Sequence, residues 1–132
     1  MSADEVRWYA GDGNGAFAGG VALPGANDGP RDIAAGDLNG DSVPDLVVTN
    51  YHGGELVWFA NQGGGAFADP AQLASIGQAW DVKLGHLDAD EHLDIAYSRR
   101  TEHLIYTMQS NGDGTFGAAR TLGSLYRPTS DT

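Results

Sequence analysis

Short apolar runs alternate with clusters of Gly, Asn, Asp and Pro along the whole chain. The runs are rich in β-branched and aromatic residues, and no window keeps the 3.6-residue period of a helix. Runs of this length between turn residues predict short β-strands. The expected strands fall into two groups of four, at residues 31–35, 46–49, 55–60 and 71–74, and at residues 80–84, 95–98, 104–108 and 119–122.

Two unrelated segments recur with one period. A glycine-rich turn occurs three times, at intervals of 50 and 49 residues, and ends at Phe17, Phe67 and Phe116. An acidic segment at residues 36–45 returns at residues 85–94, again 49 residues later. Agreement between two markers indicates an internal repeat, and periods of about 20–50 residues are typical of solenoids, propellers and arrays.

Four strands in a period near fifty favour a β-propeller blade over a sandwich, whose strands would not recur in so regular a register. We therefore predict an all-β fold, a partial β-propeller of about two and a half four-stranded blades. The repeat frame places a half blade in residues 1–28, whole blades in residues 29–77 and 78–124, and the start of another blade in residues 125–132.

The number of blades bears on assembly. A closed propeller typically has about four to eight blades, so we expect either a part of a longer propeller or a protomer whose copies complete a ring. An open piece alone would leave sheet edges unpaired and one side of its core uncovered. For that reason we favour a homo-oligomer that closes a propeller.

The segment 37–45 places oxygen-bearing groups at alternate positions and is followed at once by a β run. Ca²⁺ takes about six to eight oxygen ligands, so this segment with water could supply a shell. Its carboxylates repel one another unless a cation neutralises them. An EF-hand is excluded, because the sixth position is Ser42 instead of Gly and no helices flank the loop. The candidate calcium ligands are Asp37, Asn39, Asp41, the carbonyl of Val43, and Asp45.

At this loop, together with the Gly-Asp-Gly-x-Phe turn at residues 112–116, the chain resembles the FG-GAP/VCBS repeat family. That family includes the propellers of integrin α-subunits, many secreted bacterial proteins, and fungal and bacterial propeller lectins. The resemblance covers nearly the whole chain. It implies a propeller fold, Ca²⁺ bound in the loop at residues 37–45, and a secreted or extracellular protein. Ser42 stands where the family usually has glycine, so we expect a strained turn there.

The second copy of the loop departs further from the family pattern. His86 replaces the first Asp, and imidazole suits softer metals than Ca²⁺. The remaining candidate ligands are Asp88, Asp90, the carbonyl of His92, and Asp94. Two interpretations stay open for this loop: weak calcium binding, or hydrogen bonding without a metal. For both loops the alternative to an ion is ordinary Asp and Asn turn chemistry.

Charge and composition narrow the classes of partner. The chain has 18 Asp and Glu residues and 7 Lys and Arg residues, which gives a formal net charge of -11. This negative charge disfavours binding to nucleic acid or to anionic membranes. No run approaches the roughly 18 apolar residues of a membrane span, so no membrane insertion is expected. The chain has no cysteine, which excludes disulfides and Cys-ligated zinc.

Motifs of catalysis are missing from the sequence. It contains no Gly-x-Ser-x-Gly elbow, no His-Glu-x-x-His and no phosphate-binding Gly-x-x-x-x-Gly-Lys. We therefore expect no enzymatic activity.

The candidate binding residues lie at positions where the repeats differ. Trp80 precedes a strand at a position where the preceding repeat has Arg31, and the turn after the second strand changes between the copies. Such turns are typical of a recognition face and equally of unconstrained surface loops. Trp8 and Trp58, in equivalent strands, are expected in the core. The candidate ligand-binding residues are Trp80, Asn50, Tyr51, His52, Arg99 and Arg100.

The leading hypothesis from the sequence is a calcium-stabilised propeller module that binds carbohydrate between its blades, similar to the lectins of the family. The alternatives are a structural or protein–protein interaction propeller without a sugar site, and an accessory part of a secreted enzyme that acts on polysaccharides. Asp32, Asp81 and Asp131 recur in register, and we expect them to fix the starts of strands by local hydrogen bonds.

Overall fold

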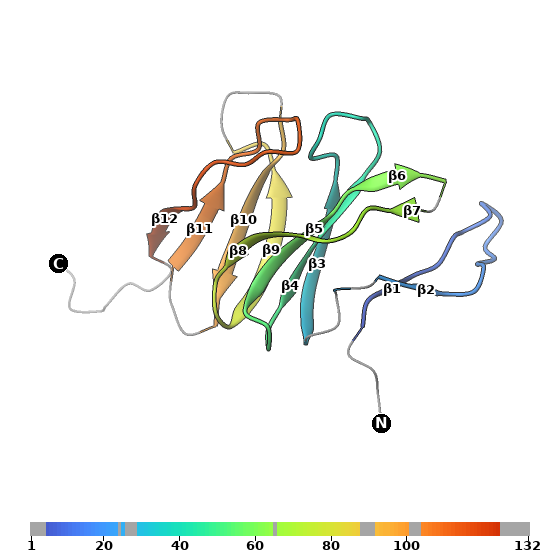
Figure 1. Ribbon diagram of the computed structural model, residues 1–132, viewed down its shortest axis with the longest axis horizontal. Helices are drawn as coiled ribbons and strands as arrows, with labels where there is room; N and C mark the ends of the chain where they lie inside the picture. The colour runs from blue at the N-terminus through green and yellow to red at the C-terminus, as the bar shows by residue number, and fades with distance from the viewer. Residues whose placement is uncertain are drawn as a thin grey trace.

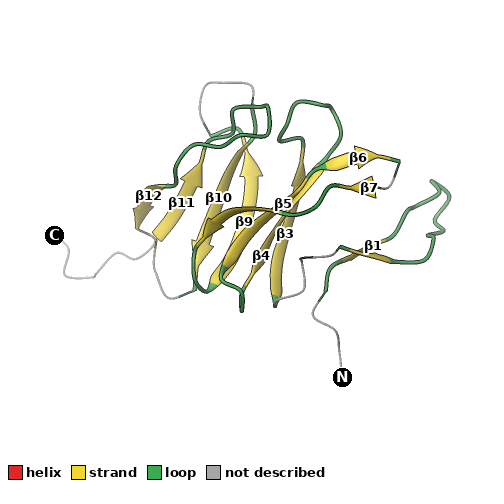
Figure 2. Ribbon diagram, viewed as in Figure 1, coloured by secondary structure: helices red, strands yellow, loops and turns green. Residues whose placement is uncertain are grey.

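A computed structural model describes residues 5–23, 25, 29–64, 66–87, 92–100 and 104–124 of the chain. These residues form twelve β-strands and no helix (Figures 1 and 2). The described part accordingly holds no helix that could cross a membrane. The all-β prediction is confirmed, and the sheets are consistent with the blades of a partial propeller.

Two four-stranded antiparallel sheets dominate the molecule, and each takes its strands from one repeat. The sheet order β3-β4-β5-β8 consists of β3 (Pro30–Gly36), β4 (Asp45–Asn50), β5 (Glu55–Phe59) and β8 (Ala71–Ser75). The order β9-β10-β11-β12 consists of β9 (Ala79–Gly85), β10 (Asp94–Arg99), β11 (Leu104–Met108) and β12 (Arg120–Ser124). We call these sheets the second and third blades. All eight strands predicted from the hydrophobic pattern are present, and their ends differ from the predicted ends by at most two residues.

Two short hairpins complete the fold. β1 (Arg7–Trp8) pairs with β2 (Val21–Ala22), as expected for the last two strands of an incomplete blade. β6 (Asn61–Gly63) and β7 (Ala66–Phe67) extend the connection between β5 and β8, in a segment where the sequence predicted only a turn. In Figure 1 the β1–β2 pair lies at the end of the molecule opposite β12.

The main core lies between the second and third blades, where β3 and β9 run side by side. Side chains alternate between the two faces of a strand, so Val47 and Leu56 enter this core while Val48 and Val57 face the other way. The buried members of the main core are Leu38, Val47, Leu56, Ile76, Ala79, Val82, Ile95, Tyr97 and Met108.

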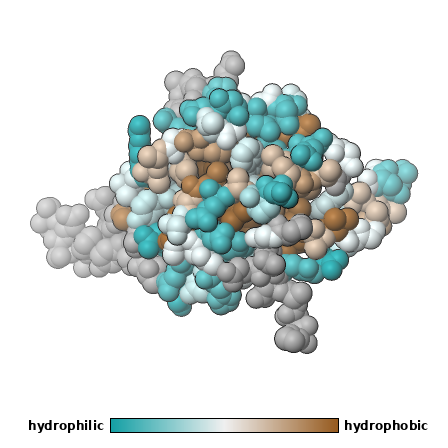
Figure 3. Space-filling view, in the orientation of Figure 1, coloured by the Kyte–Doolittle hydropathy of each residue, from teal (hydrophilic) through white to brown (hydrophobic). Residues whose placement is uncertain are grey.

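A second, smaller core joins the first hairpin to the second blade. Trp8 packs there, edge-on to Phe67 with 6.1 Å between the ring centroids. Trp58 packs against the main core and meets Phe116 at 5.6 Å in the same manner. The prediction that both tryptophans belong to the core is confirmed. On the face seen in Figure 3, apolar patches are broken up by hydrophilic side chains.

Candidate functional site

The acidic loop between β3 and β4 is closed by its first residue. Asp37 accepts backbone N–H bonds from Gly40 and Ser42 at 2.8 Å each, and longer ones from Asn39 and Asp41 at 3.3 Å. Asp41 in turn accepts the N–H of Val43. Ser42 has a φ of 67°, in the left-handed region where glycine is favoured, which confirms the expected strain at this position.

The ionisation of Asp37 follows from these donors. Burial acts to raise the pKa of its carboxyl, but the N–H donors of Ser42, Gly40, Asn39 and Asp41 together hold the pKa below its ordinary value. Asp37 is therefore a carboxylate at neutral pH.

The last acidic residue of each loop is buried and bonded to the backbone. Asp45 has no exposed surface, and its two oxygens accept the N–H groups of Leu38 at 2.9 Å and Asn61 at 2.8 Å. Asp94 repeats the arrangement one blade on, with the N–H groups of Leu87 at 3.1 Å and Ser110 at 3.0 Å. Each carboxylate thus ties the loop after the first strand of its blade to the chain that follows the third strand.

Asp37 and Asp45 direct carboxylate oxygens to backbone donors of the first loop and of the chain after β5. A carboxylate oxygen that accepts an N–H bond keeps a lone pair, so these bonds do not test calcium binding. Within the described ranges, no three His, Cys, Asp or Glu side chains form a group that could hold a metal. In the second loop His86 and His92 are exposed, and the predicted ligands Asp88 and Asp90 lie outside the described residues. Calcium therefore stays a prediction for both loops.

Four of the six candidate ligand-binding residues lie together where the second blade meets the third. Tyr51 meets the ring of Trp80 at 5.8 Å and that of His52 at 5.3 Å, both edge-on. The guanidinium carbon of Arg100 lies 5.8 Å from the Trp80 ring centroid, and its Nη1 lies 3.5 Å from the Tyr51 hydroxyl. We call Trp80, Tyr51, His52, Arg100 and Arg31 the aromatic–arginine cluster.

Arg31 is the one member of the cluster that was not among the candidate ligand-binding residues predicted from the sequence. Its guanidinium carbon lies 3.9 Å from the Trp80 ring centroid, within the range of a cation–π contact. The repeat could have indicated Arg31, because Arg31 and Trp80 occupy the same place in consecutive repeats. Neighbouring blades bring such positions side by side. The other two candidates lie apart: Asn50 is buried and donates to the carbonyl of Gly25 at 3.1 Å, and Arg99 lies beside Gly77.

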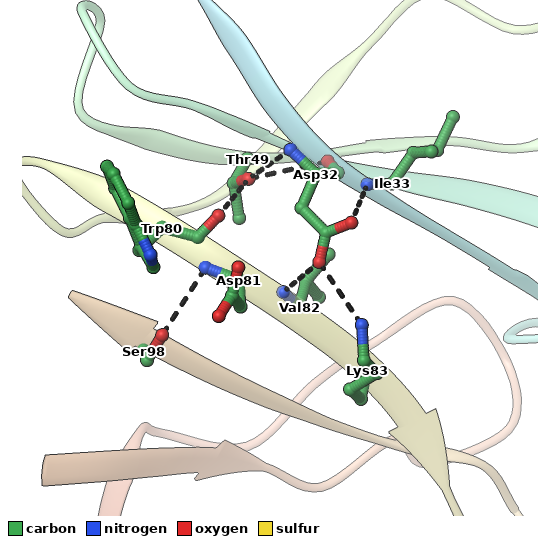
Figure 4. Close-up of polar contacts among 8 residues, drawn as sticks. All are labelled: Asp32, Ile33, Thr49, Trp80, Asp81, Val82, Lys83 and Ser98. Carbon is green, nitrogen blue, oxygen red and sulfur yellow. Dashed lines mark hydrogen bonds and ion pairs between the residues drawn. The ribbon is translucent and has the colours of Figure 1, made fainter. Parts of the chain in front are cut away.

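A set of polar contacts, which we call the blade latch, joins β3 and β4 of the second blade to β9 of the third (Figure 4). Asp32 of β3 accepts the backbone N–H of Val82 at 3.0 Å and faces Lys83 at 3.3 Å. The hydroxyl of Thr49 donates to the carbonyl of Trp80 at 3.0 Å and accepts the N–H of Asp32, also at 3.0 Å. Asp32 therefore bonds locally, as expected, and also across to the next blade. Asp131 lies outside the described residues.

The blade latch favours the ionised form of Asp32. Burial acts to raise the pKa of this carboxyl, but hydrogen bonds from Val82, Ile33 and Lys83, with the positive charge of Lys83, hold it below its ordinary value. The carboxylate is consequently present at neutral pH, where it accepts the Val82 N–H.

The fold and these contacts define the class of protein. The chain is a repeat protein built from propeller-type blades, and polar and aromatic side chains gather where two blades meet. A family model for the FG-GAP-like repeat matches residues 1–48 and 37–97. The chain therefore belongs to the FG-GAP-like repeat family, as its sequence motifs indicated. No curated protein and no solved structure matches the chain. Repeats of this family suggest a propeller-type interaction module.

Proposed function

We propose that the chain is a non-enzymatic binding module that takes carbohydrate at the aromatic–arginine cluster. One observation supports the proposal above the others: side chains that come from two blades and lie far apart in the sequence contact one another around Trp80. A set of convergent aromatic and polar groups at a boundary between structural units is a common form of ligand site.

The chemistry of the cluster suits a sugar. Aromatic rings pack against the apolar C–H faces of a sugar ring, and the Tyr51 hydroxyl, His52 and the guanidinium groups supply hydrogen bonds to its hydroxyls. The cluster gathers Arg31 and Arg100 in a chain whose formal net charge is -11. Because these two side chains can form paired, charge-assisted hydrogen bonds with a carboxylate, we expect acidic sugars to be favoured over neutral ones.

A glycan array tests the proposal with three proteins: the wild type, Arg100→Ala and Tyr9→Ala. Arg100 is exposed, so its replacement removes a donor from the cluster and should leave the fold intact. Tyr9 is an aromatic residue, 53% exposed, on the first hairpin, and it serves as the control. We expect specific glycan binding that Arg100→Ala weakens and Tyr9→Ala does not. Folded wild-type protein that binds no glycan would overturn the sugar proposal and favour a protein-interaction module.

Calcium stabilisation is proposed separately, on the alternating oxygen donors of residues 37–45. The N–H bonds to Asp37 are compatible with such binding, because a carboxylate oxygen that accepts an N–H bond keeps a lone pair for a cation. The test compares thermal melting in calcium and in chelator for the wild type, Asp41→Ala and Asp12→Ala. Asp12 accepts similar turn bonds from Asn14 and Ala16 in the first hairpin, which makes it a matched control. A calcium-dependent rise in Tm that only Asp41→Ala abolishes supports the proposal, and equal melting of the wild type in both conditions overturns it.

A further inference from the structure

Three Asn-Gly pairs occur in the chain, at residues 14–15, 39–40 and 111–112. Because glycine has no Cβ, its backbone nitrogen can closely approach the side-chain amide of the preceding Asn. In water such a pair can lose the side-chain amide without a catalyst, when the glycine nitrogen loses its proton and attacks Cγ of the Asn. A glycine whose N–H donates a hydrogen bond reacts only after that bond opens. The hydrogen bonds around the three pairs therefore decide which of them can react.

The pair in the acidic loop is held at both reacting groups. The N–H of Gly40 donates to the Asp37 carboxylate at 2.8 Å. The side chain of Asn39 is engaged as well, because its Oδ1 accepts the N–H of Asp41 at 3.3 Å. The nitrogen that would attack and the amide that would be attacked are thus both bonded within the loop.

The pair after β11 is held in a similar way. The N–H of Gly112 donates to the hydroxyl of the buried Ser110 at 3.0 Å. The Nδ2 of Asn111 donates to the hydroxyl of Thr115 at 2.8 Å. The imidazole of His92 also lies directly against Gly112, where it occupies the place of a Cβ. Movement of the Gly112 backbone toward the Asn111 amide is restricted by these contacts.

The pair in the first hairpin is bonded differently. The carboxylate of Asp12 accepts the N–H groups of Asn14 at 2.7 Å and of Ala16 at 3.2 Å. Gly15 lies between these two donors. Among the described residues, neither the N–H of Gly15 nor the side-chain amide of Asn14 has a hydrogen-bond partner, and both residues are exposed. The bonds that distinguish the three pairs lie within each turn or loop itself.

We propose that Asn14 is a site of spontaneous deamidation in the folded chain. The nitrogen of Gly15 bonds to Cγ of Asn14, and the amide nitrogen leaves as ammonia together with the proton of that N–H. Water then opens the cyclic imide at either of its carbonyls and leaves aspartate or isoaspartate. Either product adds a negative charge near the carboxylate of Asp12. Isoaspartate also lengthens the main chain before Gly15, which displaces the Ala16 N–H from its acceptor.

Peptide mass spectrometry tests the proposal on the wild-type chain, incubated at mildly alkaline pH with chelator so that no metal protects the acidic loop. The mass gain from amide to acid is followed at each pair, and a second sample is incubated in urea. In the folded chain we expect deamidation at Asn14 to be at least about tenfold faster than at Asn39 or Asn111, because those two sites must open first. In urea the three rates should become similar. Deamidation at Asn14 that is no faster than at the other two sites in the folded chain overturns the proposal.

Two variants of the acidic loop test whether the hydrogen bond is the cause. Asp37→Ala removes the acceptor of the Gly40 N–H, whereas Asp41→Ala, the matched control, leaves that bond in place. Circular dichroism shows whether each variant is folded. We expect Asp37→Ala to deamidate at Asn39 several-fold faster than the wild type and Asp41→Ala to keep the wild-type rate. An unchanged rate at Asn39 in folded Asp37→Ala would contradict the argument, and if that variant does not fold, the comparison of the three sites in the wild type decides.

Discussion

Replacing Asp45 by alanine removes one buried carboxylate and leaves two backbone N–H groups, those of Leu38 and Asn61, without their acceptor. Both donors lie at the junction of the acidic loop with the chain that leaves β5. The side chain itself has no exposed surface, so water cannot replace the carboxylate without disturbing the core around it. The perturbation is therefore local, and it concerns hydrogen bonding more than packing.

The expected loss of stability follows from the cost of unsatisfied groups. A buried donor that loses its partner costs about 1–3 kcal/mol, so two of them cost about 2–6 kcal/mol. Partial relaxation of the loop reduces this, and we expect Asp45→Ala to lose about 3–4 kcal/mol in the free energy of unfolding. Asp45→Asn has nearly the same shape and keeps one acceptor, so it should lose about half as much.

Urea unfolding followed by tryptophan fluorescence measures these differences, in calcium and in chelator. Asp69→Ala, a change of the same kind at an exposed residue, is the control and should lie within about 0.5 kcal/mol of the wild type. If Asp45 acts by holding the backbone, the loss is the same in both conditions. A loss below about 1 kcal/mol in chelator would contradict the argument, since a buried acceptor of two N–H groups should matter without any ion.

Three further outcomes follow from the backbone and the blade latch. Ser42→Gly should stabilise the chain by about 0.5–1 kcal/mol in urea unfolding, because it relieves a left-handed φ and keeps the N–H bond to Asp37; a destabilised variant would refute the strain. Gly54→Ala should destabilise by more than about 1 kcal/mol, because Gly54 has a φ of 67° and a Cβ there would lie 2.9 Å from the Cα of Gly77; wild-type melting would count against it. The lowered pKa of Asp32 means that its contribution is present above the ordinary Asp pKa and is lost as the pH falls through the folded value. Asp32→Asn should therefore reduce the difference in the free energy of unfolding between neutral and acidic pH. The same pH dependence of the unfolding free energy in the variant and the wild type would contradict this prediction.

The repeat carried most of the information about the fold. Two markers with one period, together with alternating apolar runs, were enough to predict eight strands in two blades, because each blade forms from local hairpins whose register is set by nearby turns. The β6–β7 hairpin was not predicted. Its strands are two and three residues long and contain mostly Gly, Asn and Gln, which have weak strand preferences, so only the fold of the longer strands around it holds them paired.

The sequence predicted only part of what the structure shows for the acidic loop. Its alternating oxygens indicate a cation. They do not show which oxygens will accept backbone N–H bonds, because that depends on the path of the chain after β5. Asn61 lies sixteen residues after Asp45 and supplies one of its two donors. The role of Asp45 as a buried acceptor is thus decided by a contact between two loops of the same blade.

Contacts between blades could not be predicted from the sequence for the same reason. The residue types at Trp80, Tyr51, His52 and Arg100 suggested a ligand site, but the sequence could not show that Arg31 joins them or that Asn50 turns inward to Gly25. Asp32 was expected to bond locally, and its bond to Val82, fifty residues away, appears only when the blades pack. Local hydrogen bonding and hydrophobic alternation are set by near neighbours in the chain, whereas the partner of a polar side chain at a blade boundary is set by how two sheets pack.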